Sequence, residues 1–254
     1  MKVALLQFDM IWEDVESNLA KVEAFAQSLD PDTELFILPE MFTTGFTMNP
    51  HNLFEEVGGP TLEWMLRTAK QYHVTLAGSI IVKEDDQFYN RMYWVQSDGT
   101  IHHYDKIHLF SLAKETDHYA PGISSTKVLF SEWVVNLQIC YDLRFPARLR
   151  ADLPFDLVIY VASWPQKRID AWTTLLKARA IENQCYVIGV NRVGVDNNGI
   201  AYNGQSAVYG PLGETIINCQ EQEGVFYADL SLDDLKNIRR SLPFLDDRDS
   251  ITIG

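Results

Sequence analysis

The chain has 254 residues, of which 46% are hydrophobic, so it is long enough and apolar enough to bury a large core. Its 35 acidic and 21 basic residues give a net charge of −14, which opposes binding to nucleic acid or to an anionic membrane. It has no apolar run of about 18 residues that could span a membrane, and its apolar start is too short for a signal peptide. We therefore expect a cytoplasmic protein.

Strands and helices are predicted to alternate through the first half of the chain. Helical spacing of apolar residues predicts helices at residues 16–29 and 60–73. Short apolar runs predict strands, at residues 2–8, 34–38, 74–82, 88–96 and 100–104. Residues 105–125 mix basic and aromatic side chains without a clear period, so we expect a long loop there, and loops of that length in compact domains are often functional.

The second half continues with the same kinds of element. A hairpin is predicted from residues 126–130 and 134–139, and a helix at residues 170–184. The segment 193–204, rich in Gly and Asn, predicts a loop. Further strands are predicted, at residues 156–162 and 185–191 and, in a β-meander, at residues 205–209, 214–218 and 224–229. Ser231 and Asp234 have the spacing of a capping box that opens a last helix, to about residue 241.

Hairpins interrupt the alternation of strands and helices, which favours mixed sheets over a purely parallel one. The two halves also resemble each other, because ELFILPE and DLVIYVASWP each precede a loop and a helix. We therefore predict an α/β fold: a four-layer α-β-β-α sandwich of two mixed sheets flanked by helices. No linker-like composition divides the chain, so residues 1–254 are predicted to form a single domain, with residues 242–254 as a C-terminal tail of undefined role.

The segment VVNLQICYDLRFP, residues 134–146, is distinctive because its apolar strand ends abruptly at Cys140. Asp142 and Pro146 then suit the start of a helix. A thiol at the carboxyl end of a strand faces the crevice where α/β sheets bind ligands, and a nearby helix N-terminus favours the thiolate. A lone cysteine is more often a small buried hydrophobe, which is how we interpret Cys185 and Cys219.

Three further charged residues stand at predicted strand ends or in the long loop: Glu40, Lys106 and Glu115. Each alone is most simply a solvated side chain. Together with Cys140 they could hydrolyse a carbon–nitrogen bond, because a carboxylate can move the thiol proton and activate water while an ammonium stabilises the oxyanion. A neighbouring lysine would also lower the pKa of the thiol.

Three segments, LPEMFTTGF, YDKIHLF and ICYDLRFP, resemble in sequence and order the signature segments of the nitrilase, or carbon–nitrogen hydrolase, superfamily. The resemblance covers essentially the whole chain and implies an α-β-β-α sandwich that dimerises. It implies Glu40 as general base, Lys106 as the oxyanion-stabilising lysine and Cys140 as nucleophile. Glu115 falls where the family places a second glutamate, which orients the lysine and the attacking water. Tyr141 would supply a backbone N–H to the oxyanion.

Within the superfamily the chain is most similar to the ω-amidases, with which it also shares YVASWP and KARAIENQ. This similarity implies a cysteine-dependent amidase that converts 2-oxoglutaramate or 2-oxosuccinamate to the diacid and ammonia through an acyl-thioester. It implies no cofactor, no metal, a small-molecule amide as substrate and a homodimer. The alternatives within the superfamily are a nitrilase, an N-carbamoyl amide hydrolase and an aliphatic amidase.

A substrate with a second carboxylate needs a cation at the end opposite the amide, since a buried unpaired carboxylate is costly. Arg144 and Arg168 are the candidates, although a structural ion pair for Arg144 and an exposed helix start for Arg168 are the simpler interpretations. Phe42, Tyr104 and Trp164 flank the motif residues and could line a small pocket; packing in the core explains them equally well.

Two other functions remain open from the residues alone. A metal-dependent phosphodiesterase can share a four-layer sandwich, but it would need clustered Asp, Asn and His, and the spacing of His102, His103 and His108 is not that of paired metal ligands. A binding protein without catalytic activity could use the same pocket. In that case Cys140 would react with iodoacetamide no faster than the other two cysteines.

Overall fold

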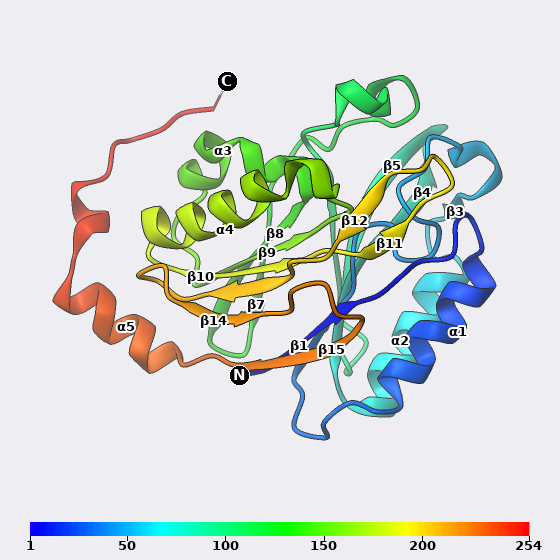
Figure 1. The fold of residues 1–254 in the computed structure, drawn as a ribbon. Coiled ribbons are helices and arrows are strands. Elements are labelled where there is room, and N and C mark those ends of the chain that lie inside the picture. Colours follow the sequence, from blue (N-terminus) through cyan, green and yellow to red (C-terminus); the bar gives the residue numbers. More distant parts are fainter. Residues whose placement is uncertain (254) are drawn as a thin grey trace.

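Two large β-sheets pack face to face in the computed structural model, which describes residues 1–253, and helices cover both outer faces (Figure 1). Helices α1 (Val15–Ala26) and α2 (Pro60–Tyr72) lie on the first sheet. Helices α3 (Pro146–Ala151) and α4 (Ile169–Asn183) lie on the second. The layers therefore follow the predicted α-β-β-α order, and Pro146 opens α3 as the sequence indicated.

The first sheet is mixed. Its strands in spatial order are β15 (Gly224–Asp229), β1 (Lys2–Gln7), β2 (Leu35–Ile37), β4 (Thr75–Glu84), β5 (Gln87–Val95) and β6 (Ile101–Asp105), with β3 (Glu55–Glu56) paired to β4. Strands β1, β2 and β4 are parallel, whereas β15, β5 and β6 run antiparallel to their neighbours. The carboxyl ends of the three parallel strands therefore meet at one edge of this sheet.

The second sheet is built in the same way. Its strands in spatial order are β14 (Thr215–Asn218), β13 (Ala207–Tyr209), β10 (Tyr186–Val190), β9 (Leu157–Val161), β8 (Trp133–Ile139) and β7 (Thr126–Phe130). Strands β8, β9 and β10 are parallel, and the predicted hairpin of β7 and β8 is confirmed. Each sheet thus has a parallel centre with antiparallel flanks.

Alternate residues of β1 face different layers. Val3 and Leu5 pack between the two sheets, whereas Ala4 and Leu6 pack against the layer of α1 and α2, and all four are fully buried. Because both faces of the sheet are covered, the strand appears in the sequence as a continuous apolar run rather than as an alternation. Both faces of β1 therefore lie in the hydrophobic core.

Two predictions about the last third of the chain are wrong. The third strand of the expected meander, β15, leaves the second sheet, crosses to the first and pairs antiparallel with β1, with Lys2 opposite Asp229. A period-2 pattern shows that a segment pairs but not which sheet edge it joins. The expected loop at residues 193–204 contains a small two-stranded sheet, β11 (Val193–Val195) and β12 (Ala201–Asn203).

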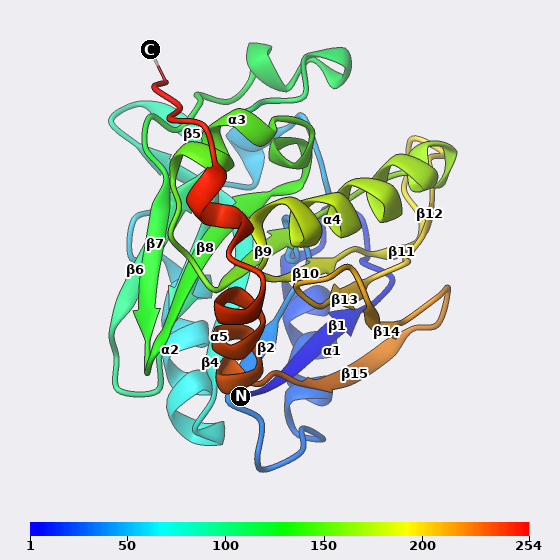
Figure 2. The ribbon, with the colours of Figure 1, turned by 90° about the vertical axis from the view of Figure 1, so that its left-hand side faces the viewer.

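The long loop after β6 is confirmed, and it carries two short 3₁₀ turns, Ser111–Ala113 and Glu115–Asp117. The start of α5 (Leu232–Ser241) is also as predicted, because Ser231 Oγ accepts a hydrogen bond from Asp234 N at 3.1 Å. Figure 2 shows the chain after α5 running toward the end of the molecule that carries α3. Among residues 1–253, no helix has both the length and the apolar character that crossing a bilayer requires.

Candidate active site

Cys140 follows the last residue of β8 and begins a 3₁₀ turn, Cys140–Arg144. Its φ is +47°, a left-handed conformation that is uncommon outside glycine, and backbone strain of this kind is concentrated at functional sites. The residue is 8% exposed and lines a cavity. The structure therefore places the thiol at the carboxyl end of a strand, facing open space, as the sequence predicted.

Asp142 holds the cysteine turn in place. Its Oδ2 accepts hydrogen bonds from Ile139 N at 3.0 Å and from the Tyr104 hydroxyl at 2.8 Å. Its Oδ1 accepts from His108 N at 3.0 Å. Since Tyr104 and His108 flank Lys106 in the sequence, this one buried carboxylate ties the turn of the second sheet to the segment of the first sheet that carries the lysine.

Glu40, Lys106 and Glu115 form a cluster of charged side chains that are all 0% exposed. Lys106 Nζ lies 2.9 Å from Glu40 Oε1, and 3.0 and 2.9 Å from the two oxygens of Glu115. Glu40 comes from the loop after β2, Lys106 from the end of β6 and Glu115 from the long loop. Their charges act directly on Cys140, which comes from the other sheet. The structure thus brings together the four residues that the sequence predicted.

Neutral donors complete the surroundings of the two carboxylates. Glu40 Oε1 also accepts from Asn90 Nδ2 at 2.8 Å, and Glu40 Oε2 accepts from the backbone N–H of Ser163 at 2.8 Å. Glu115 Oε2 accepts from the backbone N–H of Phe110 at 2.5 Å. A buried charge is tolerated when it is both paired and hydrogen-bonded, and both conditions are met here.

The pKa values in the cluster follow from burial and from the neighbouring charges. Burial alone would lower the pKa of Lys106, but Glu115 and Glu40 outweigh it and hold that pKa well above its ordinary value. Burial raises the pKa of Glu115, and Lys106 only partly opposes the rise. The ammonium form of Lys106 is therefore favoured throughout the physiological pH range.

The surroundings of Cys140 favour the thiol over the thiolate. Burial and then Glu40 raise its pKa well above the ordinary value, and the opposing effect of Lys106 is smaller. Lys106 therefore acts on this pKa in the predicted direction, but burial and the two carboxylates raise the pKa by more. A protonated thiol needs a base before it can attack a carbon atom.

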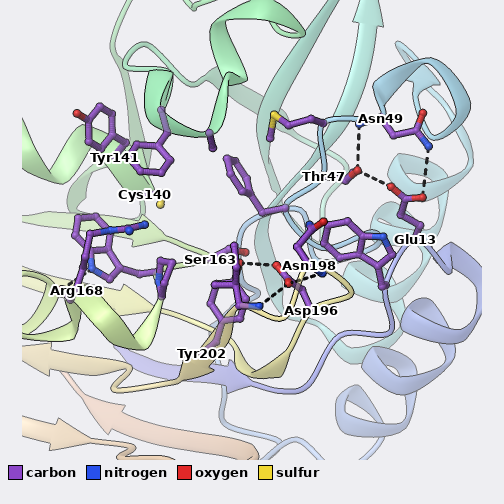
Figure 3. Close-up of a pocket in the computed structure, with 18 of the residues that line it drawn as sticks. Glu13, Thr47, Asn49, Cys140, Tyr141, Ser163, Arg168, Asp196, Asn198 and Tyr202 are labelled. Atoms are coloured by element: carbon purple, nitrogen blue, oxygen red, sulfur yellow. Dashed lines mark hydrogen bonds between the residues drawn. The ribbon is translucent and has the colours of Figure 1, made fainter.

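A cavity of about 540 Å³ opens beside Cys140, as Figure 3 shows. Tyr141 and Arg168 lie on the same side of it as the sulfur. Glu13 and Asn49 lie across it, joined by a hydrogen bond of 3.4 Å from Asn49 Nδ2 to Glu13 Oε2. The volume is within the range of sites for small organic molecules.

Three of the residues predicted to contact the substrate line this cavity: Arg144, Trp164 and Arg168. The Arg144 guanidinium lies 5.1 Å from the centre of the Trp164 ring, and that of Arg168 lies 5.0 Å from the centre of the Phe110 ring. Within residues 1–253 neither arginine forms an ion pair with an acidic side chain. The interpretation of Arg144 as part of a structural ion pair is therefore wrong.

The other two predicted substrate contacts, Phe42 and Tyr104, do not line the cavity. Phe42 is fully buried in the layer between the first sheet and its helices, with its ring centre 6.3 Å from that of Trp64. Tyr104 is 1% exposed and uses its hydroxyl on Asp142. Both residues are close to motif residues in the sequence, but Phe42 lies in the turn after β2 and Tyr104 is occupied by Asp142, so closeness in sequence does not bring either side chain to the cavity.

Two donors of this site, Asn90 and Ser163, were not predicted from the sequence. Asn90 is an amide within a strand whose inward positions are otherwise mostly apolar, and a buried polar residue in such a run is a usable signal of function. Ser163 contributes its backbone N–H to Glu40. A main-chain contact of this kind leaves no signature in residue type.

The chain matches known proteins over its whole length. Residues 2–240 match the family model described as "Carbon-nitrogen hydrolase". The chain is 40% identical to "Omega-amidase YafV" of Yersinia enterocolitica, covering 100% of this chain and 98% of that protein. It is 33% identical to "2-oxoglutaramate amidase" of Bacillus subtilis, covering 96% of each. A solved CN-hydrolase superfamily protein of Xanthomonas campestris, described with an arsenic adduct in its active site, superposes with a TM-score of 0.97 at 38% identity, covering 100% and 99% of the two chains.

Fold and sequence agree on the class of protein: it is a hydrolase that acts on carbon–nitrogen bonds. The chain belongs to the carbon–nitrogen hydrolase family, and its full-length relatives mark it as an amidase of that family. The resemblance found in the three signature segments and the fold class it implied are both confirmed.

Proposed function

We propose that this protein is a cysteine-dependent amidase that hydrolyses the terminal amide of small 2-oxo dicarboxylic acid monoamides, such as 2-oxoglutaramate and 2-oxosuccinamate. The observation that carries the proposal is the placement of the Cys140 thiol, held by a strained turn at a cavity and next to a buried Glu–Lys–Glu cluster. The names of full-length relatives, an omega-amidase and a 2-oxoglutaramate amidase, support the choice of substrate.

In the first half of the reaction Glu40 accepts the thiol proton while Cys140 Sγ attacks the amide carbon. The oxyanion of the tetrahedral intermediate meets the Lys106 ammonium and the backbone N–H of Tyr141. When the carbon–nitrogen bond breaks, Glu40 returns its proton to the departing nitrogen, and ammonia leaves. The product of this half is an acyl-thioester on Cys140.

In the second half a water molecule attacks the thioester carbon. Glu40 removes a proton from that water and returns it to sulfur as the carbon–sulfur bond breaks, which releases the diacid. Glu115 orients Lys106, because both of its oxygens accept hydrogen bonds from the ammonium. It also orients the attacking water. The reaction uses no cofactor.

The far carboxylate of the substrate binds the two arginines of the cavity, Arg144 and Arg168. Both guanidiniums line the cavity and lack an acidic partner within residues 1–253, so a carboxylate there would supply the missing pairs. Trp164 forms the wall beneath Arg144.

Ammonia release tests the proposal. The wild type and Cys140→Ala are compared on 2-oxoglutaramate, glutamine and a simple nitrile. Turnover of the oxo-amide alone, lost in Cys140→Ala with an unchanged melting temperature, is the expected result. Ammonia release that survives in Cys140→Ala would refute the mechanism, and turnover of glutamine or the nitrile in preference to the oxo-amide would refute the substrate.

We further propose that the protein acts in the cytoplasm as a homodimer. A reducing compartment keeps a catalytic thiol free, and the three cysteines of this chain are all unpaired. Light scattering should give about twice the chain mass of 29.1 kDa, and a monomer would refute the dimer.

A further inference from the structure

Asn90 lies between the two carboxylates of the cluster. It belongs to β5, opposite Ile81 of β4, and is 1% exposed. Its Nδ2 donates to Glu40 Oε1 at 2.8 Å and reaches Glu115 Oε1 at 3.4 Å. Its backbone carbonyl accepts from the backbone N–H of Lys106 at 3.0 Å, so the same residue is bonded to both carboxylates and to the main chain of the lysine.

The orientation of the Asn90 amide is fixed by charge. Its Oδ1 is buried and has no hydrogen-bond partner among residues 1–253. A flipped amide would satisfy no further group and would turn Oδ1 toward the oxygens of Glu40 and Glu115, which repel it. A buried oxygen without a hydrogen-bond partner needs an explanation. Here the explanation is that the NH₂ group of the same amide must face the two carboxylates.

A neutral donor suits this position better than the alternatives. An apolar side chain would leave Glu40 Oε1 with Lys106 as its sole partner and would remove one of the three donors that hold the carboxylate. A second cation would cancel the negative charge that makes the carboxylate a base. An amide fixes direction without adding charge.

We propose that Asn90 is a positioning residue of the reaction, which orients the Glu40 carboxylate so that its free lone pair faces the thiol of Cys140. With Lys106 and Asn90 on Oε1 and the backbone of Ser163 on Oε2, Glu40 has three donors that define its plane. The proposal rests on the role of Glu40 as the base in the proposed function. It adds that the base works only when a neighbouring amide holds it.

A pair of variants of equal shape tests this. Asn90→Val has no donor, whereas Asn90→Thr has nearly the same shape and keeps one hydroxyl donor. Asn183→Ala is the matched control, because Asn183 is also fully buried and donates to a backbone carbonyl, Arg179 O, outside the site. The first readout is the rate of Cys140 alkylation by iodoacetamide against pH, measured by peptide mass spectrometry. The second is kcat and KM for 2-oxoglutaramate, and the third is the melting temperature.

Asn90→Val is expected to lower both the alkylation rate and kcat by about tenfold to a hundredfold, the effect of losing one hydrogen bond to a buried charge, with KM within about threefold of wild type. Its alkylation profile should begin to rise at a higher pH, and Asn90→Thr should recover part of the rate. Asn183→Ala should lower the melting temperature and leave the alkylation profile unchanged.

Alkylation of Asn90→Val at the wild-type rate and with the wild-type pH profile would overturn the proposal. So would an equal loss in Asn90→Val and Asn90→Thr without a change of profile, because that result describes packing alone. The alkylation readout does not depend on the substrate. If the wild type fails to hydrolyse any amide while the alkylation difference holds, the proposed substrate fails and the role of Asn90 stands.

Discussion

Replacing Lys106 with methionine should destabilise the folded protein strongly, because it leaves two carboxylates buried without their cation. Lys106 Nζ lies within 3.0 Å of Glu40 Oε1 and of both oxygens of Glu115, and all three side chains are 0% exposed. Methionine has a similar length without the charge. The remaining donors to the two carboxylates are neutral amides, which orient the oxygens but cannot balance their charge.

The magnitude follows from the burial. Removing one partner of a buried ion pair costs about 3–5 kcal/mol. At about 2–4 °C for each kcal/mol, the melting temperature should fall by roughly 6–20 °C. Lys106 lowers the pKa of Glu115, so its removal raises that pKa further. A carboxyl group whose pKa is higher in the folded than in the unfolded protein stabilises the fold fully below the unfolded pKa, about 4.3. That contribution to the unfolding free energy is lost as the pH rises through the pKa of the folded protein. The deficit should therefore be larger near neutral pH than near pH 5.

Urea unfolding at about pH 5 and about pH 7.5 measures this difference. The control is Lys83→Met, since Lys83 is a partly exposed lysine paired with the exposed Asp86, and it should change the unfolding free energy by less than about 0.5 kcal/mol. The double variant Lys106→Met/Glu115→Gln should regain part of the loss, because one of the two unpaired charges is gone. If Lys106→Met unfolds within about 1 kcal/mol of wild type at the higher pH, the ion pair does not hold the cluster and the reasoning is refuted.

Three further outcomes are expected. Arg168→Met should raise KM for a carboxylate-bearing amide about tenfold or more with little change in kcat, and an equal rise for an uncharged amide would contradict the assignment. Asp142→Ala should lower kcat and the melting temperature together, because the cysteine turn loses the hydrogen bonds of Asp142 with Ile139 N, Tyr104 and His108. A wild-type kcat would show that the turn keeps its conformation without Asp142. Burial and Asp142 raise the pKa of Tyr104 well above its ordinary value. The neutral phenol therefore stabilises the folded protein fully below the pKa of the unfolded chain, about 10. This stabilisation is lost as the pH rises through the pKa of the folded protein. Urea midpoints should therefore fall above about pH 10, and a flat profile would contradict this burial.

The buried strands could be predicted because a sheet covered on both faces leaves a continuous apolar run in the sequence. Every residue of β9 (Leu157–Val161) is fully buried, and the expected strand at residues 156–162 differs from it by one residue at each end. The pairing of strands could not be predicted in the same way. Strand β15 has the pattern of a meander strand, and its place beside β1 depends on which edge the folded chain leaves free.

The charged members of the site could be predicted from their motif segments, but the directions of side chains could not. Glu40 points between the sheets, whereas Phe42, two residues later, packs under the helices. The contact from Ser163 N to the Glu40 carboxylate spans 123 residues, and Ser163 contributes only its main chain to it. Such facts depend on tertiary packing, which brings the ends of two sheets together and leaves no trace in the local sequence.

The surplus of negative charge in the cluster explains why proton transfer and attack belong together in the proposed reaction. When both carboxylates are ionised, Glu40, Lys106 and Glu115 carry one more negative than positive charge. A thiolate on Cys140 would add a second negative charge to this buried site. Burial and the negative charge together therefore raise the pKa of the thiol. Transfer of the thiol proton to Glu40 leaves the total charge unchanged, but it neutralises Glu40 and places the negative charge on sulfur. The negative charge that then passes from sulfur to the substrate oxygen faces Lys106 with only Glu115 to offset it, so the lysine acts most strongly at the oxyanion. A preformed thiolate would instead need a second cation in contact with the cluster, and none of residues 1–253 supplies one.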